Sequence, residues 1–371
     1  MRKHSVIILI MLVPMIVGIA VLIGLLSMWN KPLGPSLELP TQITRTSTLS
    51  PTSAAQGLDS TAVSTPTQAP TTAQISTPTQ LPVTNAEPLC GGPAVMTILA
   101  IGSDERSPGY LYGLADTVRV VRIDFITPRV MMVDLPRDLW VEIPGIADHY
   151  GITHGKLNQA YFFGNPGMGY YDGPGEGPGL LARTLEVNFG LRVDHYLAID
   201  METFIGVIDA VNGVDIYVDT PIDLNEPGST EDPALKLEVG THHLDGELAG
   251  ILARNRQPTT FQRALYQNMI LRGLQNKVFS PSIIPELPNL IAEFSHSVQT
   301  DLSLNDINKL VCLGQALTED NTVNVTFPEG MFTAGRVYDP YRNANTFIFE
   351  VDPEQMRAYM ADFMNGTWPS R

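Results

Sequence analysis

Arginines are few in this acidic chain, yet several occupy positions where α/β proteins usually build a binding site. The chain has 39 acidic and 23 basic residues. The arginines in question follow apolar runs or end helical patterns, and they are Arg106, Arg137, Arg254, Arg256 and Arg263. The planar guanidinium group donates paired hydrogen bonds that match the oxygens of a phosphate. A cluster of these side chains would therefore bind a phosphate-containing ligand.

Two carboxylates are expected beside these arginines. Asp104 and Asp116 lie at the ends of neighbouring predicted strands, and loops at one edge of the sheet form the site in α/β proteins. Mg²⁺ prefers carboxylate and phosphate oxygens, so we expect Asp104 and Asp116 to hold it. Alternatively, the arginines cap helices or pair with Asp138 or Asp116 for structural reasons. Five like charges repel unless an anion joins them, which favours the ligand interpretation.

The elements that position these residues alternate between strands and helices. Short apolar runs predict strands at Val95–Ile101, Thr117–Ile123, Arg129–Leu135, His195–Ile199, Val214–Val218 and Val323–Phe327. Helical periodicity predicts helices at Lys156–Phe163, Gly179–Phe189, Met201–Val211, Leu244–Ala253, Phe261–Phe279, Leu304–Leu317 and Pro353–Met364. This alternation predicts an α/β fold with a central mixed sheet between helical layers. Consecutive strands early in the domain argue against a purely parallel sheet.

An uncharged apolar run near the N-terminus predicts a membrane anchor. Val6–Met28 has 23 residues and follows Arg2, Lys3 and His4. A helix over this run would be about 35 Å long, enough to cross a hydrocarbon core of about 30 Å. Basic residues flanking a membrane span stay on the cytoplasmic side, so residues 1–5 should be cytoplasmic. The protein would then cross the cell membrane once, and the residues after Met28 would be extracytoplasmic. A cleaved signal peptide is the alternative, but its apolar region is usually shorter and precedes a small-residue cleavage site.

Residues 29–88 are rich in Thr, Ser and Pro, which predicts a disordered linker. The pentapeptide Ser-Thr-Pro-Thr-Gln occurs at Ser64–Gln68 and again at Ser76–Gln80, and residues 32–88 contain no aromatic residue. Such a composition buries too little apolar surface to offset the chain entropy lost on folding. We expect a tether that spans on the order of 40–45 Å as a random coil.

Residues 89–371 predict one extracytoplasmic domain, because no second low-complexity stretch divides them. Their number is sufficient for one large core. The formal net charge of −16 argues against nucleic acid as a partner. Cys90 and Cys312 would lie outside a reducing compartment, so a disulfide is possible, but their spacing leaves the question open. The sequence also leaves the oligomeric state open.

Successive blocks of the domain resemble the LytR–CpsA–Psr family. They follow the family's order between about residue 95 and residue 280. The blocks are Gly102–Arg106, Ala115–Thr117, Leu135–Asp138, Lys156–Tyr161, Asp194–Tyr196, Asn212–Asp215 and Leu244–Ala249, which leads into Arg254–Arg256. An anchor followed by an outside domain is also the family's layout. Many blocks in the right order are far more specific than any single block.

The resemblance implies a three-layer α/β/α domain with an apolar groove for a polyprenyl chain. It implies a phosphotransferase that moves a glycopolymer from a polyprenyl-pyrophosphate carrier in the cytoplasmic membrane onto a cell-wall acceptor such as peptidoglycan, with Mg²⁺ on the pyrophosphate. By position, Asp104 and Asp116 would hold the metal or activate the acceptor hydroxyl, and Arg137 would act with them. The pyrophosphate would be bound by residues of the same pocket, namely Arg106, Arg137, Arg254, Arg256, Arg263 and Gln267.

Three positions depart from the family's pattern. Leu114 and Tyr266 stand where the family usually has arginine, and Thr260 stands in place of an aspartate. Arg106 or Arg119 would have to replace the missing charge. Two other functions are therefore open: a degenerate module that binds polyprenyl phosphates or glycopolymer without chemistry, and a stalked adhesin with no small-molecule site. We expect an active transferase because the metal-side and Arg-x-Arg positions are retained.

Overall fold

The computed structural model describes residues 29–39, 86–105, 112–149, 151–225, 230–255, 257, 262–278, 280, 282–283, 286–294 and 297–369. Across these ranges, no helix is both long and apolar enough to cross a bilayer, and the predicted span Val6–Met28 lies outside them. Residues 40–85, most of the predicted linker, also lie outside the described ranges.

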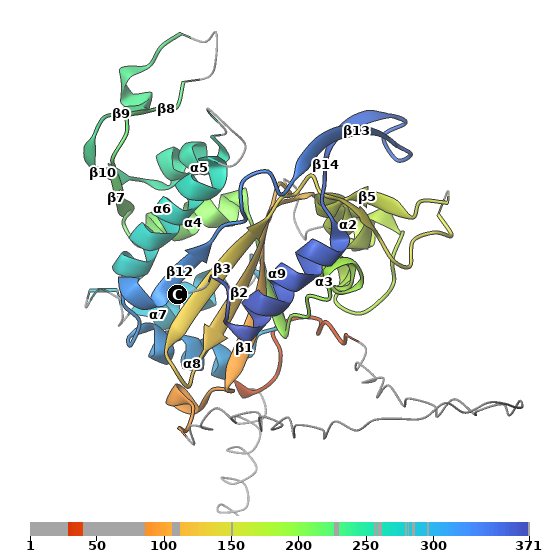
Figure 1. Ribbon diagram of the computed structural model, residues 1–371. Coiled ribbons are helices and arrows are strands. Elements are labelled where there is room, and N and C mark those ends of the chain that lie inside the picture. The colour runs from red at the N-terminus through yellow and green to blue at the C-terminus, as the bar shows by residue number, and fades with distance from the viewer. Residues whose placement is uncertain are drawn as a thin grey trace, which may run out of the picture. The chain divides into compact units, whose positions relative to one another are not determined.

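A mixed sheet forms the centre of the domain (Figure 1). Its strands in the described part of the chain follow the spatial order β11-β6-β1-β2-β3-β12. Their bounds are β1 Val95–Ser103, β2 Ala115–Asp124, β3 Arg129–Leu135, β6 His195–Asp200, β11 Gln299–Thr300 and β12 Thr322–Val325. β1, β2 and β3 pair antiparallel, whereas β6 runs parallel to β1 and β12 runs parallel to β3. The predicted α/β class with a central mixed sheet is confirmed.

Helices cover both faces of this sheet. The helices on one face are α2 (Leu157–Gly164), α3 (Glu176–Phe189) and α9 (Pro353–Asn365), and they share one apolar core with Leu99, Val120 and Val133 of β1–β3. On the opposite face, α8 (Leu304–Gly314) packs against Ile98 and its neighbours in a second core. The alternation of side chains along each strand supplies both faces.

A third apolar cluster joins four helices to a small two-stranded sheet. The helices are α4 (Met201–Ala210), α5 (Gly246–Arg254), α6 (Gln262–Val278) and α7 (Leu287–Phe294). The sheet pairs β7 (Val214–Val218) with β10 (Gly240–Leu244). Short elements complete the described chain: β4 Trp140–Glu142, β5 His154–Lys156, β8 Ile222–Asp223, β9 Lys236–Leu237, and the 3-10 turns η1 Leu89–Gly91, η2 Pro166–Met168, η3 Pro233–Leu235 and η5 Glu319–Asn321. This cluster positions α6, which carries part of the site described below.

The C-terminal part of the domain adds a hairpin that the sequence did not predict. β13 (Thr333–Asp339) pairs antiparallel with β14 (Ala344–Glu350), and the hairpin projects beyond the end of the central sheet in Figure 1. Its inner face buries Ile348 and Asp339. Its outer face is exposed.

Cys90 and Cys312 form a disulfide, which settles the pairing that the spacing left open. The bridge joins η1 to α8, with 6.0 Å between the two Cα atoms and 222 positions between the residues. It therefore ties the start of the domain to a helix late in the chain, across the second core.

Replacing both cysteines by serine should lower the free energy of unfolding by about 3–5 kcal/mol, because the bridge closes a very long loop in the unfolded chain. Equilibrium unfolding in denaturant measures the change. A reductant should bring the wild type to the same stability and leave the double variant unchanged. If the reductant destabilised the wild type and the double serine variant equally, the disulfide would not be the source of the stability.

The start of the predicted linker is packed on the domain, so the prediction of a disordered linker from residue 29 is wrong for Pro32–Leu39. The backbone N–H of Leu33 donates to the carbonyl of Leu302 at 3.2 Å. The side chain of Leu37 is only 3% exposed and belongs to the first core. Arg192 Nη2 donates to the carbonyl of Leu39 at 2.8 Å. Leucines in this short segment supply the apolar surface that the Thr/Pro-rich stretch lacks.

Candidate active site

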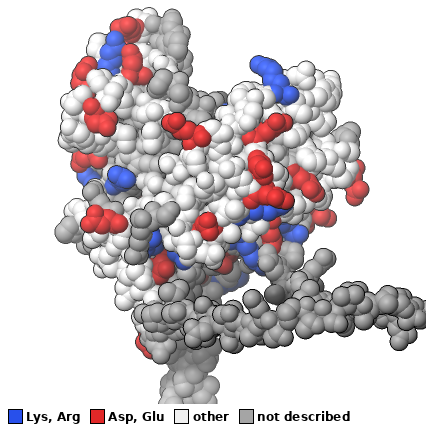
Figure 2. Space-filling model, viewed as in Figure 1, with Lys and Arg blue, Asp and Glu red and all other residues white. Residues whose placement is uncertain are grey.

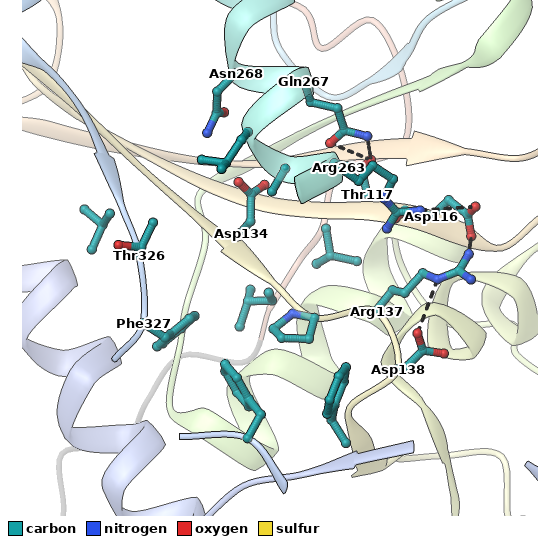
Figure 3. Close-up of a pocket in the computed structure, with 18 of the residues that line it drawn as sticks. Asp116, Thr117, Asp134, Arg137, Asp138, Arg263, Gln267, Asn268, Thr326 and Phe327 are labelled. Atoms are coloured by element: carbon teal, nitrogen blue, oxygen red, sulfur yellow. Dashed lines mark hydrogen bonds and ion pairs between the residues drawn. The ribbon is translucent and has the colours of Figure 1, made fainter. Parts of the chain in front are cut away.

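A cavity of about 570 Å³ opens where the ends of β2 and β3 meet the first turns of α6 and the segment after β12 (Figure 3). Most of its wall is apolar, and three phenylalanines line the side formed by the C-terminal part of the chain: Phe327, Phe332 and Phe349. The polar lining residues include Asp116, Thr117, Asp134, Arg137, Asp138, Arg263, Gln267, Asn268, Thr326 and Glu329. The cavity thus combines an apolar wall with a charged rim.

Two predicted phosphate-binding arginines converge on one predicted carboxylate. Arg137 Nη1 donates to Asp116 Oδ1, and Arg263 Nη2 donates to the backbone carbonyl of Asp116 at 2.7 Å. Arg263 Nη1 also lies 3.7 Å from Asp116 Oδ2. Figure 3 shows both guanidinium groups directed at Asp116 from different elements. Segments far apart in the sequence therefore bring together Asp116, Arg137 and Arg263, as predicted.

A buried ion-pair network supports Arg137 from behind. Asp138 Oδ2 lies 3.5 Å from Arg137 Nε, and Asp138 Oδ1 accepts a hydrogen bond from Lys156 Nζ at 2.8 Å. Gln159 then accepts from the backbone N–H of Lys156 and donates to Asp339 of β13 at 2.9 Å. Together with the bond from Nη1 to Asp116, this network restricts the direction of Arg137, although Nε faces Asp138 without a hydrogen bond. The sequence assigned no role to Lys156 or Gln159, although both lie in a family block.

Asp104 lies beside this cluster on the loop after β1. Its carboxylate accepts a hydrogen bond from the backbone N–H of Leu114 at 2.6 Å. Partial desolvation raises the pKa of Asp104; the bond from Leu114 lowers this pKa, and the neighbouring Asp116 carboxylate raises it again. The net pKa is above the ordinary value of an aspartate. A carboxylate with a raised pKa accepts a proton more readily, which suits a general base.

Gln267 lies one helical turn after Arg263, so both face the cavity from α6. Its Nε2 donates to Thr117 Oγ1 and to the carbonyl of Ala253, each at 3.1 Å. Thr117 belongs to β2 and was not predicted to take part. The contact joins α6 to the strand that carries Asp116. Gln267 thereby holds Arg263 of α6 close to Asp116 of β2.

Among the described residues, the predicted site residue Arg254 is not found at the cavity. Arg254 ends α5 with an exposed side chain whose Nε donates to Gly250 at 3.0 Å, and it does not line the cavity. Arg106 and Arg256 lie outside the described residues, as does Thr260. The predicted roles of these three positions stay predictions.

The residues that depart from the family's pattern add no positive charge to the rim of the cavity. Tyr266 is buried in the third cluster and its hydroxyl donates to the carbonyl of Gln257 at 3.0 Å, so it does not line the cavity. The backbone of Leu114 makes hydrogen bonds to both Asp104 and Asp116, so this position supports the two carboxylates without its side chain. Arg119 is buried in a two-pronged ion pair with Asp134, at 2.7 and 2.9 Å. It is therefore committed to Asp134 and does not replace a missing arginine at the rim.

Comparison with known proteins places this geometry in context. Over 219 residues the chain is 31% identical to the polyisoprenyl-teichoic acid–peptidoglycan teichoic acid transferase TagU of Oceanobacillus iheyensis, which covers 58% of this chain and 62% of that relative. The regulatory protein MsrR of Staphylococcus aureus is 28% identical over 211 residues, 56% of each chain. The chain thus matches only about three fifths of the length of these relatives.

Solved structures share the fold. The crystal structure of TagV from B. subtilis superposes with a TM-score of 0.55 at 24% identity, over 73% of this chain and 97% of that chain. The structure of TagT bound to LIIa-WTA superposes with a TM-score of 0.51 at 20% identity, over 73% and 90% of the two chains. The model of the LytR_cpsA_psr family matches residues 64–359, and with this match the chain belongs to the LytR–CpsA–Psr family.

Proposed function

We propose that this protein transfers a glycopolymer from a polyprenyl-pyrophosphate carrier onto a cell-wall acceptor such as peptidoglycan. The observation that carries the proposal is the convergence of Arg137 and Arg263 on Asp116 at the rim of a largely apolar cavity, with Asp104 beside them. A charged rim suits a pyrophosphate, and an apolar wall suits the first part of a hydrocarbon chain. The named activity of the relative TagU supports the same reaction class.

In this mechanism the arginines exchange one anion for another. In the structure Asp116 pairs with both guanidinium groups, and its single negative charge leaves one positive charge of the two arginines for a ligand. A pyrophosphate would take over the donors of Arg137 and Arg263, because it offers more oxygens and more negative charge than one carboxylate. Asp116 would then be released towards Asp104. Positioning and charge neutralisation are what phosphoryl transfer chiefly requires of a protein.

The two carboxylates fit a magnesium ion that is shared with the substrate. Among the described residues no group of three or more His, Cys, Asp and Glu side chains could enclose a metal. Mg²⁺ is commonly held by one or two carboxylates plus substrate phosphates, which matches Asp104 and Asp116. When bound, the ion would neutralise the charge of the pyrophosphate.

The bond changes follow from the arrangement. The acceptor hydroxyl attacks the phosphorus that carries the glycopolymer, a new P–O bond to the acceptor forms, and the P–O bond to the carrier breaks. Polyprenyl phosphate is the leaving group. The hydroxyl proton passes to the Asp104 carboxylate. Transfer by the purified full chain, with Mg²⁺, carrier-linked glycopolymer and peptidoglycan, tests the proposal through release of polyprenyl phosphate. No release by the wild-type protein would overturn it.

Two observations favour a second candidate, a module that binds the carrier without chemistry. Tyr266 is buried away from the cavity, and Arg119 is committed to Asp134, so neither supplies a further cation to the rim. A binding module would retain the carrier lipid on purification and cleave no pyrophosphate. The same assay distinguishes the two candidates.

In this proposal Val6–Met28 anchors the protein in the cytoplasmic membrane with its N-terminus inside, and the domain lies close to the bilayer. Residues 29–31 alone separate that span from the docked segment Pro32–Leu39. Leu39 and Glu87, which flank residues 40–86 in the sequence, both belong to the same compact unit. The length of residues 40–86 therefore adds no reach between the anchor and the site, in contrast to the expected tether.

Cleavage within residues 40–85 should leave the domain on the membrane, because Pro32–Leu39 holds it without the covalent connection. A protease site inserted between Ser60 and Thr61 allows the test on washed membranes. Leu37→Asp should release the cleaved domain, because the buried leucine would become a buried charge. Leu33→Asp is the matched control, since that side chain is exposed. Release of the wild-type domain on cleavage would contradict the docking.

A further inference from the structure

Aromatic side chains run in a row from the cavity wall onto the exposed face of the hairpin β13–β14. Phe332 and Phe349 both line the cavity, with ring centroids 6.3 Å apart. Phe349 makes an edge contact with Phe347, with centroids 5.1 Å apart. Phe347 is 39% exposed, and Tyr338 on the neighbouring strand is 54% exposed. We call Phe332, Phe349, Phe347 and Tyr338 the aromatic track.

The pairing of the hairpin places the outer members of the track on one face. Phe347 lies opposite Arg336, and Tyr338 lies opposite Asn345. Residues two apart on a strand share a face, so Phe347, Arg336, Tyr338 and Asn345 all point outward. The inward face holds the buried Ile348 instead. The outer face therefore alternates aromatic rings with side chains that form hydrogen bonds.

The hairpin is rigidly attached to the charged rim of the cavity. The backbone N–H of Phe349 donates to the carbonyl of Asp138 at 2.9 Å, one residue after Arg137. Asp339, at the end of β13, accepts from Gln159 at 2.9 Å and is 1% exposed. The track therefore begins beside the proposed pyrophosphate site and has a fixed direction from it.

The chemistry of this face matches a sugar chain. Exposed aromatic residues are unremarkable singly, but a contiguous row that leads out of a site marks an interaction surface. Sugar rings present C–H groups to the electron-rich face of an aromatic ring, and their hydroxyls bond to groups such as Arg336 and Asn345. A hydrocarbon chain would lose this match, because the row is open to water and interleaved with polar groups.

The position of the hairpin indicates which sugar chain it meets. In Figure 1 the hairpin lies at the top of the view, whereas Trp29–Leu39, drawn in red, lies at the bottom. The cavity opens at the same end of the central sheet as the hairpin, and its apolar wall suits the carrier, so the open face beside it is left for the acceptor. Figure 2 shows mostly uncharged side chains over this end. We propose that the aromatic track binds the glycan strand of the acceptor and directs it to the rim; this inference rests on the proposed transfer reaction.

Co-sedimentation of the full chain in detergent with purified peptidoglycan sacculi, stripped of attached polymers, tests the inference. The double variant Tyr338→Ala/Phe347→Ser should bind the sacculi at least tenfold more weakly than the wild type. Tyr338→Ala alone should weaken binding severalfold, and it leaves the core untouched because the ring is mostly exposed. Phe347→Trp should retain binding. The matched control is Tyr217→Ala, since Tyr217 is a 63% exposed tyrosine on β7.

A second measurement separates this inference from the proposed function. A short-chain prenyl pyrophosphate without sugar should bind equally to the wild type and the double variant. If the wild type does not bind the prenyl pyrophosphate, the proposed function is wrong. The binding of sacculi then still tests the aromatic track independently. Unchanged binding of sacculi by the double variant would overturn the inference. An equal loss of sacculus binding in Tyr217→Ala would overturn it too. So would a variant that binds sacculi normally but has lost binding of the carrier-linked glycopolymer, because that result would assign the track to the donor.

Discussion

Replacing Arg263 by glutamine should lower the rate of glycopolymer transfer about 10²- to 10³-fold, the usual effect of removing one donor that stabilises charge in a transition state. Arg263 is one of two described arginines that reach Asp116, and it lies on the cavity wall. Glutamine keeps a hydrogen-bond donor and loses the positive charge. The loss should therefore fall mainly on kcat, because negative charge on the transferred phosphoryl group is best stabilised at the moment of transfer.

A matched control lies on the same helix. Arg272 is also in α6, but its side chain is exposed and it does not line the cavity. Arg272→Gln should leave kcat unchanged. Arg263→Lys should give an intermediate rate, because lysine restores the charge without the paired geometry. Equal rates for Arg263→Gln and the wild type, with unchanged thermal midpoints, would exclude Arg263 from the pyrophosphate site.

The elements that carry the site were largely predictable, because their patterns are local. The apolar runs that became β1, β2 and β3 are within a few residues of their observed bounds, and α6 matches the helix predicted over Phe261–Phe279 closely. Asp116 and Arg137 come together because β2 and β3 are neighbours in the sheet. That proximity follows from the order of two consecutive strands joined by a tight turn.

The features that the sequence did not predict depend on the direction of a side chain or on contacts with residues far away in the chain. Arg254 is at the predicted helix end, but its side chain returns to the carbonyl of Gly250 rather than reaching the cavity. The docking of Leu37 could not be predicted, because its backbone lies beside Gly175 and the neighbouring Leu39 bonds to Arg192, both far along the chain. The hairpin β13–β14 was missed because Thr333–Asp339 exposes most of its side chains and lacks an apolar run.

Replacing Asp104 by asparagine should reduce transfer about 10²- to 10⁴-fold, the range expected for a general base. Asparagine retains the oxygen that accepts the bond from Leu114 and removes only the ionisable group. In the wild type, transfer should fall as the pH drops through the raised pKa of Asp104, above the ordinary aspartate value of about 3.9. The rate of the variant should be low and nearly independent of pH across that range.

The same substitution should stabilise the fold, and the sign follows from the direction of the pKa shift. A carboxyl with a raised pKa in the folded state binds its proton more tightly there than in the unfolded chain. The protonated carboxyl therefore adds to the free energy of unfolding at low pH, and this addition is lost as the pH rises and the group ionises. Asp104→Asn should raise the thermal midpoint at neutral pH, and the gain should shrink as the pH is lowered towards 4. Asp320→Asn, at an exposed position outside the site, should change neither rate nor midpoint.

The two roles open to Asp104 can be told apart with the same variant. If Asp104 chiefly holds Mg²⁺, raising the magnesium concentration should restore much of the lost rate, because Asp116 remains to bind the ion. If Asp104 accepts the hydroxyl proton, added magnesium should restore little. A variant that is slow, more stable and not rescued by magnesium would therefore identify Asp104 as the base, whereas a variant as fast as the wild type would exclude both roles.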